Sequence, residues 1–400
     1  METFDEFIRR ILKIVFWLFI PISLILAPIY FIVAEQGRDI FPISLYDPLA
    51  KPEVIFAIQN ELFASPFFKV AVFPGFTFAA LIATMMILFE RKFLAKINLR
   101  VGPLYAGRFE GVLQPIADLF KLLFKEIIIP RKSDKLFFLA TPLLIFAVSA
   151  SLLSVIPLAP ELNIVVEILG VTMVKVFMAP VVIAPSSIGL LIFFAAMGFF
   201  PLIVLIAGWA SSNKFSFIGG LRALHQMISY EIPLILSAVG VVILSGSLDL
   251  MQIVAAQTTV WFIIPQILGA IIFYIAALAE LERIPFDTPE ADTEIVAGWL
   301  TEYSGMAFGL IQLAVYIKFY ALAALFTVLF LGGWLGPAFL HPIGWFMLKT
   351  IIVMIVMIFP RAANPRVRMD MMVRIGWTWL IIFAIINLLI AVAAASFVNF

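Results

Sequence analysis

The chain has 400 residues, of which 64% are hydrophobic and 13% are charged, and its net charge at pH 7 is +1. Soluble domains carry about 25% charged residues, and a soluble fold of this length could not bury so much apolar side chain. The small net charge argues against a nucleic-acid-binding surface. The absence of cysteine excludes disulfides and thiolate-ligated iron–sulfur clusters in this chain. Two histidines, His225 and His341, cannot ligate a pair of haems, so an electron carrier must be a lipid or belong to another subunit.

Apolar runs long enough to cross a bilayer recur along the whole chain. A membrane helix needs about 20 mostly apolar residues. The first run contains two prolines and no small-residue cleavage site, so we interpret it as a retained helix and not as a signal peptide. This pattern predicts an all-α polytopic membrane protein with about nine transmembrane helices. The expected spans are residues 14–33, 70–89, 136–157, 186–208, 232–248, 260–279, 307–331, 343–360 and 376–397.

Residues 161–185 are also apolar, but they contain Lys175 and several prolines. This composition favours an interfacial loop over a tenth span. We find no internal repeat, which weighs against transporter architectures built on paired halves. A stand-alone proton-coupled transporter is therefore a poor fit to the sequence, and the long loops weigh against it too.

The basic residues predict which ends of the helices face the cytoplasm. With nine alternating spans, most of the 26 Lys and Arg residues fall on the side of the N-terminus. The loop at residues 90–135 is the richest in them. The positive-inside rule therefore places the N-terminus and the long loops in the cytoplasm.

One of these loops has the pattern of an amphipathic helix. Residues 111–130 alternate apolar and charged positions at helical spacing, with Asp118, Lys121, Lys125 and Glu126 on or near one face. One interpretation is a helix that lies on the lipid headgroups. The other is a helix that packs under a partner subunit and lines a cavity.

The segment 279–303 concentrates acidic residues between two apolar runs. Carboxylates beside apolar helices are costly to ionise, and each further carboxylate raises the cost. These groups should not all be ionised, and their titrations should be coupled, so they could bind and release protons near neutral pH. A solvated acidic loop is the alternative. The segment has one cation, Arg283, and seven acids: Glu280, Glu282, Asp287, Glu290, Asp292, Glu294 and Glu302.

Glu231 is a second acid at or inside a membrane boundary. The sequence LRALHQMISYEIPLIL leads from a loop into the span at 232–248. An ionisable residue at this depth is a functional hypothesis by default. The alternative is a capping or pairing role with Tyr230 or Arg222.

Five longer segments carry a family resemblance. They are ERKFLAKINLRVGP (90–103), LQPIADLFKLLFKE (113–126), GWASSNKFSFIGGLRALHQMISYE (208–231), AELERIPFDTPEADTEIVAGWLTEYSGM (279–306) and PRVRMD (365–370). In this order and with this internal spacing, they resemble the H subunit of respiratory complex I, the family of mitochondrial NADH dehydrogenase subunit 1. The resemblance covers residues 67–398.

The resemblance implies a fold, a function and partners. It implies eight family helices in residues 67–400, with residues 1–66 adding one helix and an outer loop. In that family the protein joins the membrane arm to the peripheral redox arm, and we expect this chain in a prokaryotic plasma membrane as a multi-pass protein. Its loops form much of the chamber where quinone, the substrate, meets the last iron–sulfur cluster of a partner subunit. The chain itself holds no cofactor, and its buried carboxylates link the chamber to proton-pumping subunits.

Carried over by position, the resemblance assigns residues to two groups. Those that would line or shape the quinone chamber are Arg91, Arg100, Asp118, Lys121, Lys125, Arg283 and Arg361. Those that would form an acidic funnel and the start of the proton path are Glu231, Glu280, Asp287, Glu290, Asp292, Glu294, Glu302 and Tyr303. Lys214 and Arg222 would organise the loop before Glu231. Lys349 matches a lysine common in the family's seventh helix, and its alternative is a side chain that reaches the outer surface.

The chain departs from the family at several of these positions. The family usually has Asn, Ala or Thr in place of Glu282, so this acid either joins the relay or balances Arg283. Val315 stands where many members have glutamate, and Lys318 lies inside the same span as a substitute polar group. Gly198 occupies the place of a glutamate found in some bacterial members.

Two related complexes share this core. The alternative to a quinone-linked enzyme is the equivalent subunit of a membrane-bound [NiFe] hydrogenase or a ferredoxin-driven ion pump. The intact loops from 90 to 126 and the complete TEY segment favour the quinone-linked enzyme.

Overall fold

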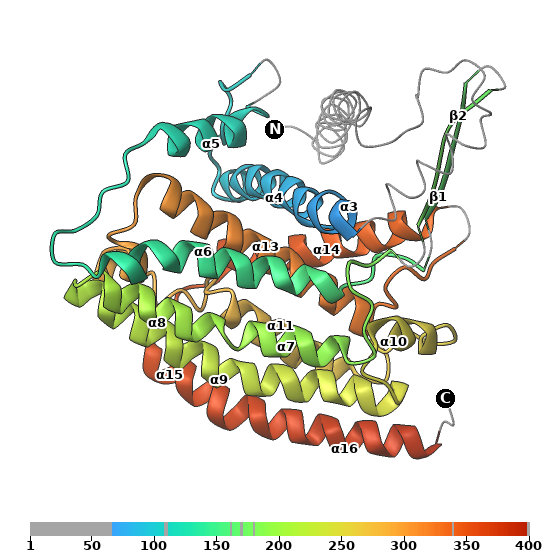
Figure 1. The fold of residues 1–400 in the computed structure, drawn as a ribbon. Coiled ribbons are helices and arrows are strands. Elements are labelled where there is room, and N and C mark those ends of the chain that lie inside the picture. Colours follow the sequence, from blue (N-terminus) through green and yellow to red (C-terminus); the bar gives the residue numbers. More distant parts are fainter. Residues whose placement is uncertain are drawn as a thin grey trace. The chain divides into compact units, whose positions relative to one another are not determined.

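Helices dominate the computed structural model, which describes residues 66–107, 111–160, 162–168, 171–178, 181–337 and 340–397 (Figure 1). They are α3 (Pro66–Ala71), α4 (Phe76–Ile97), α5 (Gln114–Phe124), α6 (Lys135–Leu152), α7 (Gly189–Met197), α8 (Phe200–Ala210), α9 (Lys214–Ser245), α10 (Leu250–Ala256), α11 (Ile267–Glu280), α12 (Asp292–Ile295), α13 (Gly305–Phe330), α14 (Pro342–Ala363), α15 (Met369–Arg374) and α16 (Ile381–Phe397). Short helical turns occur at Leu153–Val155 (η2), Gly298–Leu300 (η3) and Ile375–Leu380 (η4).

Seven stretches in the described part of the chain are long and apolar enough to cross a membrane. They confirm a polytopic membrane fold, and each overlaps one expected span. They are Phe68–Ile97, Lys135–Val155, Gly189–Ala210, Lys214–Ser245, Gly305–Phe330, Pro342–Ala363 and Met369–Ser396. The expected helix at 14–33, with most of the N-terminal region 1–66, lies outside the described residues.

The expected span at 260–279 differs from the prediction, because its helix, α11, has only 14 residues. The preceding residues form a turn fixed by the buried side chain of Gln257. Its amide nitrogen donates to Val328 O at 2.8 Å, and its oxygen accepts from Phe262 N at 3.2 Å and Gly332 N at 2.9 Å. A buried amide that binds the backbone in this way can replace helical hydrogen bonds.

Helix α9 is longer than predicted, with 32 residues. Asn213 caps its start by accepting from Phe215 N at 3.0 Å, and Gly246 ends it with a φ of 67°. Residues 214–231, which we expected in a loop, are therefore its first half. Glu231 consequently lies near the middle of this helix.

Residues 161–185 contain no long helix in their described part, as expected, but they are not only a loop. Strands β1 (Leu162–Ile168) and β2 (Val171–Met178) pair in a two-stranded sheet. Most of this sheet belongs to a small compact unit, and the long helices form a separate, larger unit.

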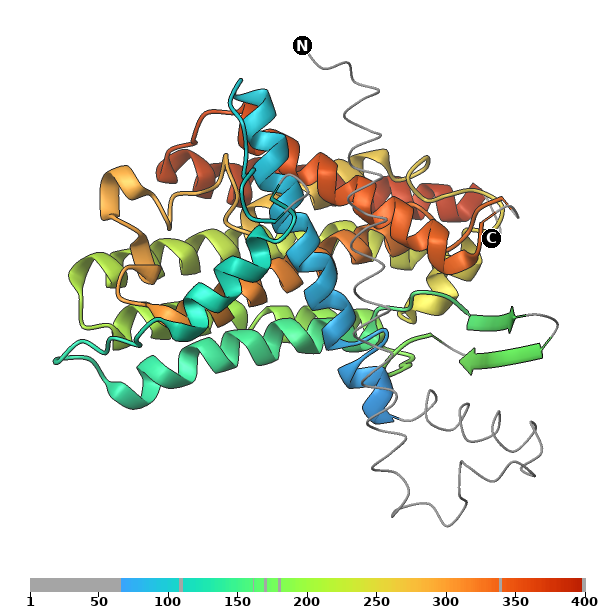
Figure 2. The ribbon, with the colours of Figure 1, turned by 90° about the horizontal axis from the view of Figure 1, so that it is seen from above.

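Within the larger unit, two helices organise the packing. Helix α9 packs on α8, α11 and α16, and α13 packs on α6, α14 and α4. In Figure 1, α8, α9 and α16 lie one below the other, and in Figure 2, α4 crosses the direction of α6 and α9. Helix α13 is almost wholly buried from Ile317 to Phe330, so polar groups on it are shielded from lipid.

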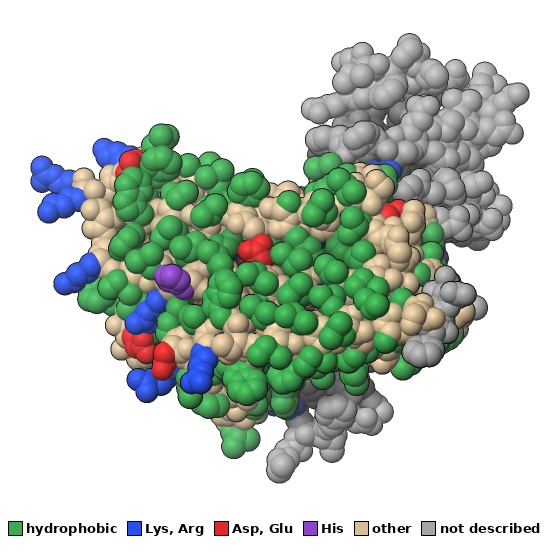
Figure 3. Space-filling model, turned by 90° about the horizontal axis from the view of Figure 1, so that it is seen from below, with side chains coloured by type: hydrophobic (Ala, Val, Ile, Leu, Met, Phe, Trp, Pro, Cys, Tyr) green, Lys and Arg blue, Asp and Glu red, His purple; other side chains and the backbone are tan. Residues whose placement is uncertain are grey.

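The face formed by the lowest helices of Figure 1 is mostly apolar (Figure 3). Lys and Arg side chains gather at one edge of this face, and acidic side chains are sparse across its middle. Exposed side chains of α16, such as Ile382, Leu389 and Val392, contribute to the apolar exposed surface. This distribution is typical of a surface in contact with lipid tails.

Candidate functional site

Helix α11 ends in a turn that sends two neighbouring charged side chains into different clusters. Arg283 N donates to Leu278 O at 3.2 Å, and Glu282 N donates to Ala279 O at 3.2 Å. This pair of hydrogen bonds is a Schellman motif, in which the residue after the cap takes a left-handed conformation. Glu282 occupies that position, with a φ of 52°.

The first cluster is centred on Glu90 of α4, which is 1% exposed. Its Oε2 accepts from Arg283 Nη1 at 3.0 Å and from the Tyr316 hydroxyl at 2.9 Å, and its Oε1 accepts from Arg361 Nη1. The Arg283 guanidinium also lies 4.1 Å from the ring centroid of Phe319. Both oxygens of this carboxylate are therefore hydrogen-bonded.

The second cluster is centred on Lys318 of α13, which is 1% exposed. Its ammonium donates to Glu280 Oε1 at 2.7 Å and to Glu280 O at 3.0 Å. It also lies 3.7 Å from the ring centroid of Phe200. Removal of one partner from a buried ion pair of this kind is strongly unfavourable, because it leaves an uncompensated charge. Lys318, noted in the sequence only as a substitute polar group, is thus the central cation of the acidic region.

Two carboxylate oxygens of this cluster have no hydrogen-bond donor among the described residues, Glu280 Oε2 and Glu282 Oε1. Glu282 Oε2 accepts from the indole Nε1 of Trp299 at 3.3 Å. Burial, followed by the charge of Glu290, raises the pKa of Glu282 well above its usual range. Glu231 also interacts electrostatically with both Lys318 and Glu280.

Close packing positions the groups around Glu282. A Cβ at Gly219 of α9 would lie 2.6 Å from Trp299 N, so α9 can approach the η3 turn only with glycine there. Gln226 of α9 fastens the segment after α11, because its Nε2 donates to Ala279 O and Phe286 O, each at 2.7 Å. The turn that holds Glu282 is thereby tied to α9.

The structure places the acids of this segment in different surroundings, since Asp287, Glu290 and Glu302 are partly buried. Glu280 and Glu282 are buried, whereas Glu294 is 53% exposed and pairs with Arg222 at 2.5 Å. Asp287 pairs with Arg366 at 2.8 Å, and Glu302 accepts from Asn213 Nδ2 at 2.6 Å. Neither the solvated loop nor the single cluster expected from the sequence describes the whole segment. Asp292 begins α12, and its side chain lies outside the described part.

Tyr303 anchors the end of the acidic segment. Its ring stacks on Phe138 of α6, with ring centroids 4.4 Å apart. Burial raises its pKa to about 12, so the phenol remains neutral at physiological pH. The neighbouring Ser304 hydroxyl binds the loop after α5, accepting from Ile128 N at 3.0 Å.

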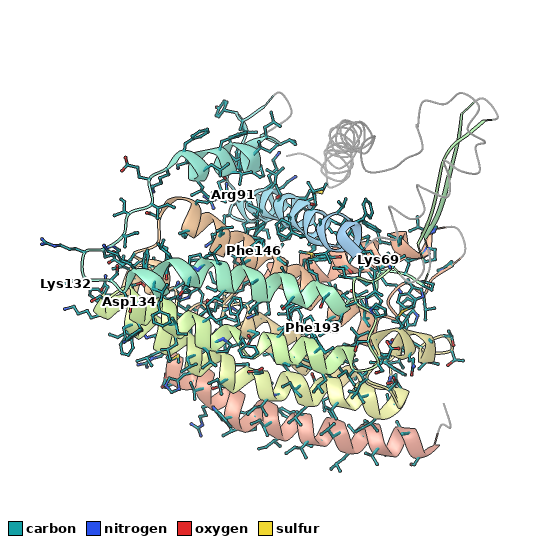
Figure 4. The ribbon with its side chains drawn as sticks, in the orientation of Figure 1. Lys69, Arg91, Lys132, Asp134, Phe146 and Phe193 are labelled. Carbon is teal, nitrogen blue, oxygen red and sulfur yellow. The ribbon has the colours of Figure 1, made fainter. Side chains whose placement is uncertain are left out.

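The residues expected at a quinone chamber occupy two places. Arg283 and Arg361 meet at Glu90, and Arg91 of α4 pairs with Asp118 of α5. Arg100, Lys121 and Lys125 are exposed. Figure 4 labels Arg91 on α4, and Lys132 and Asp134 close to the start of α6.

Helix α5 is amphipathic, as expected, and none of its residues is buried. Leu119, Phe120, Leu123 and Phe124 are all exposed. An exposed apolar surface of this kind needs lipid or a partner protein to cover it.

Sequence reasoning missed several residues of these clusters. Glu90 ends an apolar span and begins a family motif, but nothing in its sequence context indicated two guanidinium partners. Tyr316, Trp299 and Gln226 were not singled out either. The alternative for Lys349, a side chain that reaches the outer surface, does not describe the structure, because the residue is 7% exposed and its ammonium donates to Leu331 O at 2.7 Å and Leu335 O at 2.5 Å.

No group of three or more His, Cys, Asp or Glu residues in the described ranges could hold a metal ion. The polar groups of the two clusters are suited instead to proton binding and to charge compensation. The buried carboxyls, one ammonium and two guanidiniums lie on α4, α11, α13 and α14 and in the turn after α11.

Comparisons with known proteins agree with the family resemblance. The family model described as NADH dehydrogenase matches residues 70–392. A protein from Brevibacillus brevis, named as the H subunit of NADH-quinone oxidoreductase, is 42% identical over 320 residues, covering 79% of this chain and 89% of its own. Proteins of the same name from Geobacillus thermodenitrificans and Anoxybacillus flavithermus are 41% and 43% identical, covering 78% and 77% of this chain and 90% and 87% of their own.

Proposed function

Since the chain belongs to the NADH dehydrogenase family, we propose that it is the membrane subunit that joins the two arms of a proton-translocating NADH:quinone oxidoreductase. In this role it forms much of the quinone chamber and couples quinone reduction to proton translocation. It is one subunit of an oxidoreductase complex and is not active alone. The iron–sulfur clusters belong to partner subunits, and the long loops face the cytoplasm of a plasma membrane.

The observation that carries this proposal is the placement of both charge clusters along one buried helix. Tyr316 and Lys318, two residues apart on α13, contact Glu90 and Glu280 respectively. Both clusters are thus built on the same turn of α13, which supports a coupling between a charge change at one and the protonation of the other. For a charge 4 Å from a carboxyl group, at an effective dielectric constant of about 20, the interaction is worth about 4 kcal/mol.

An interaction of that size is enough to move a proton. About 4 kcal/mol corresponds to about 3 pKa units, which reverses the protonation of a carboxyl group near neutral pH. We assign the chamber side to Arg91, Arg100, Asp118, Lys121, Lys125, Arg283 and Arg361. We assign the proton path to the acids that face or interact with Lys318 and Glu282, which are Glu231, Glu280 and Glu290.

Three other acids of the segment have a different role in this proposal. Asp287, Glu294 and Glu302 are held by Arg366, Arg222 and Asn213, which supports a role in shaping the loop at the entrance of the funnel. The exposed apolar residues of α5 support a helix that packs under the peripheral subunit carrying the last iron–sulfur cluster. The roles of Asp292 and Tyr303 stay predictions.

The test uses the purified intact complex. Glu231→Gln and Glu290→Gln should each lower quinone reductase activity and proton translocation while the complex assembles in normal amounts. Asp249→Asn is a matched control, because Asp249 caps α10, accepting from Met251 N at 2.9 Å, and asparagine caps equally well. Wild-type turnover in both glutamine variants would remove these acids from the mechanism.

A second measurement addresses the chamber. A photoreactive quinone should label peptides that contain Arg91 or Asp118, and labelling elsewhere would contradict the assignment. The alternative, a hydrogenase or ferredoxin-driven ion pump, shares the helical core but has no quinone. The names of the relatives favour the quinone enzyme, and identification of the partner subunits separates the two.

A further inference from the structure

The Lys318 cluster contains fewer cations than buried carboxyl groups. The side chains of Glu280 and Lys318 are each 1% exposed, and that of Glu282 is 8% exposed. Lys318 is the cation that acts on both acids. One ammonium balances one carboxylate, and an unbalanced buried charge is strongly unfavourable. One of the two carboxyl groups therefore holds a proton at rest.

The hydrogen bonds indicate which carboxyl group it is. Glu280 accepts directly from the ammonium at 2.7 Å, whereas Glu282 accepts only from the indole of Trp299 among the described residues. Arg283 follows Glu282 in sequence but cannot balance it, because the Arg283 guanidinium is bonded to Glu90 at 3.0 Å. Glu280 is thus the ionised member of the pair.

We propose that Glu282 holds the exchangeable proton of this cluster and that Lys318 is the positioning residue that keeps Glu280 ionised to receive it. This inference rests on the proposed function and adds two residues to its proton path. Transfer breaks the O–H bond at Glu282 Oε1 and forms an O–H bond at Glu280 Oε2. Glu282 becomes the carboxylate and Glu280 the neutral acid, no electron is transferred, and the charge of the cluster is unchanged.

The backbone supplies an independent observation. Glu282 occupies the left-handed position of the Schellman motif, with a φ of 52°, where glycine and asparagine are favoured. A non-glycine residue with a long side chain in that position is strained, and strain of this kind concentrates at functional sites. The strain is consistent with a glutamate that is needed for its carboxyl group.

The surroundings of Glu282 agree with the assignment. Glu290, Lys318, Glu280 and the Trp299 indole are the groups that act on it. Burial comes first among the causes that raise the pKa of Glu282, followed by the negative charge of Glu290. Only Lys318 and Trp299 oppose this shift, and Lys318 is bonded to Glu280.

The test is an infrared pH-difference spectrum of the purified intact complex without quinone. The wild-type spectrum should contain the carbonyl band of a protonated carboxyl group that disappears on titration to alkaline pH. Glu282→Gln, which preserves length and neutrality, should remove this band, and Glu282→Asp should shift it. The control Asp249→Asn should leave the band in place. An identical spectrum for wild type and Glu282→Gln would overturn the proposal.

Lys318→Met tests the positioning role. Without the ammonium, Glu280 should take up a proton, and a second protonated-carboxyl band should appear. Absence of that band in an assembled Lys318→Met complex would overturn the role of Lys318. If this variant does not assemble, the Glu282→Asp shift still decides where the proton is. Quinone reduction by the wild-type complex is measured separately, so failure of the proposed function is distinguishable from failure of this inference.

Discussion

The two buried charge clusters differ in how completely their carboxylates are bonded. Glu90 has donors on both oxygens, from Arg361 on one and from Arg283 and Tyr316 on the other. In the Lys318 cluster, Glu280 and Glu282 each have one oxygen without a donor in the described part of the chain. Similar burial can therefore accompany either a fully bonded carboxylate or carboxyl groups with an oxygen left open for a proton.

The two clusters differ in this way because their ratios of cations to carboxyl groups differ. Two guanidiniums on one carboxylate leave no advantage in protonating Glu90, because the proton would break strong charge-assisted hydrogen bonds. One ammonium among several acids makes the protonation of one acid favourable. We therefore regard the Glu90 cluster as structural and the Lys318 cluster as the one whose protonation can change.

The largest expected effect on assembly comes from a substitution that breaks the Glu90 cluster. Glu90→Leu leaves Arg283, 7% exposed, without a carboxylate, and loss of one partner of a buried ion pair costs about 3–5 kcal/mol. The complex should fail to assemble, as measured by native electrophoresis of solubilised membranes. Asp118→Asn, which breaks a partly exposed pair with Arg91, should assemble normally, and normal assembly of Glu90→Leu would contradict a structural role.

The Lys318 cluster should tolerate the loss of one acid but not of two. In Glu280→Gln, Glu282 can release its proton and become the counter-ion of Lys318, so the single change should destabilise less than Glu90→Leu. In the double variant Glu280→Gln with Glu282→Gln, this compensation is lost. The non-additive part should be about 0.5–3 kcal/mol, measured from heat-induced dissociation of the complex. Additive effects would show that the two acids do not share one proton.

A pH dependence follows from the raised pKa of Glu282. Above about pH 4.3, the ordinary glutamate pKa, and up to the raised pKa, the folded chain binds one proton that the unfolded chain has released. Stability therefore falls as pH rises through this window, by at most about 1.4 kcal/mol per pH unit. Glu282→Gln should flatten this slope in dissociation measurements across the neutral range. A slope as steep as that of wild type would place the proton elsewhere.

The smallest effect on stability is expected for the exposed acid Glu294. Glu294 is 53% exposed in its pair with Arg222, and exposed ion pairs contribute about 0–1 kcal/mol. Glu294→Gln should therefore change the dissociation midpoint little, and added salt should reduce the difference further. A loss of stability as large as that of Glu90→Leu would mean that the exposed acid contributes as much to stability as the buried one.

The long helices were predictable because a span of about 20 apolar residues has few other stable structures in lipid. Apolar composition could not locate the start of α11, because the turn before it depends on hydrogen bonds from the Gln257 side chain. It also could not show that residues 214–231 continue α9, since the same pattern suits a loop helix and a membrane helix.

The chemistry of the acidic segment was predictable as a type but not in its arrangement. Density of carboxylates indicated coupled protonation, and the family resemblance identified the positions. The sequence left open whether Glu282 balances Arg283. The structure places Arg283 on Glu90, 193 positions away, and Glu282 on Trp299. Pairings over such distances depend on helix packing, which local patterns do not encode.

The ion pair between Lys318 and Glu280 has a consequence for how this sequence can diverge. The ammonium of Lys318 depends on the carboxylate of Glu280, since loss of either partner leaves an unbalanced charge in the buried interior. We expect relatives with a basic residue at position 318 to keep an acidic residue at position 280. Position 282 can be neutral in such relatives without changing the resting charge, a pattern that an alignment of the family can measure.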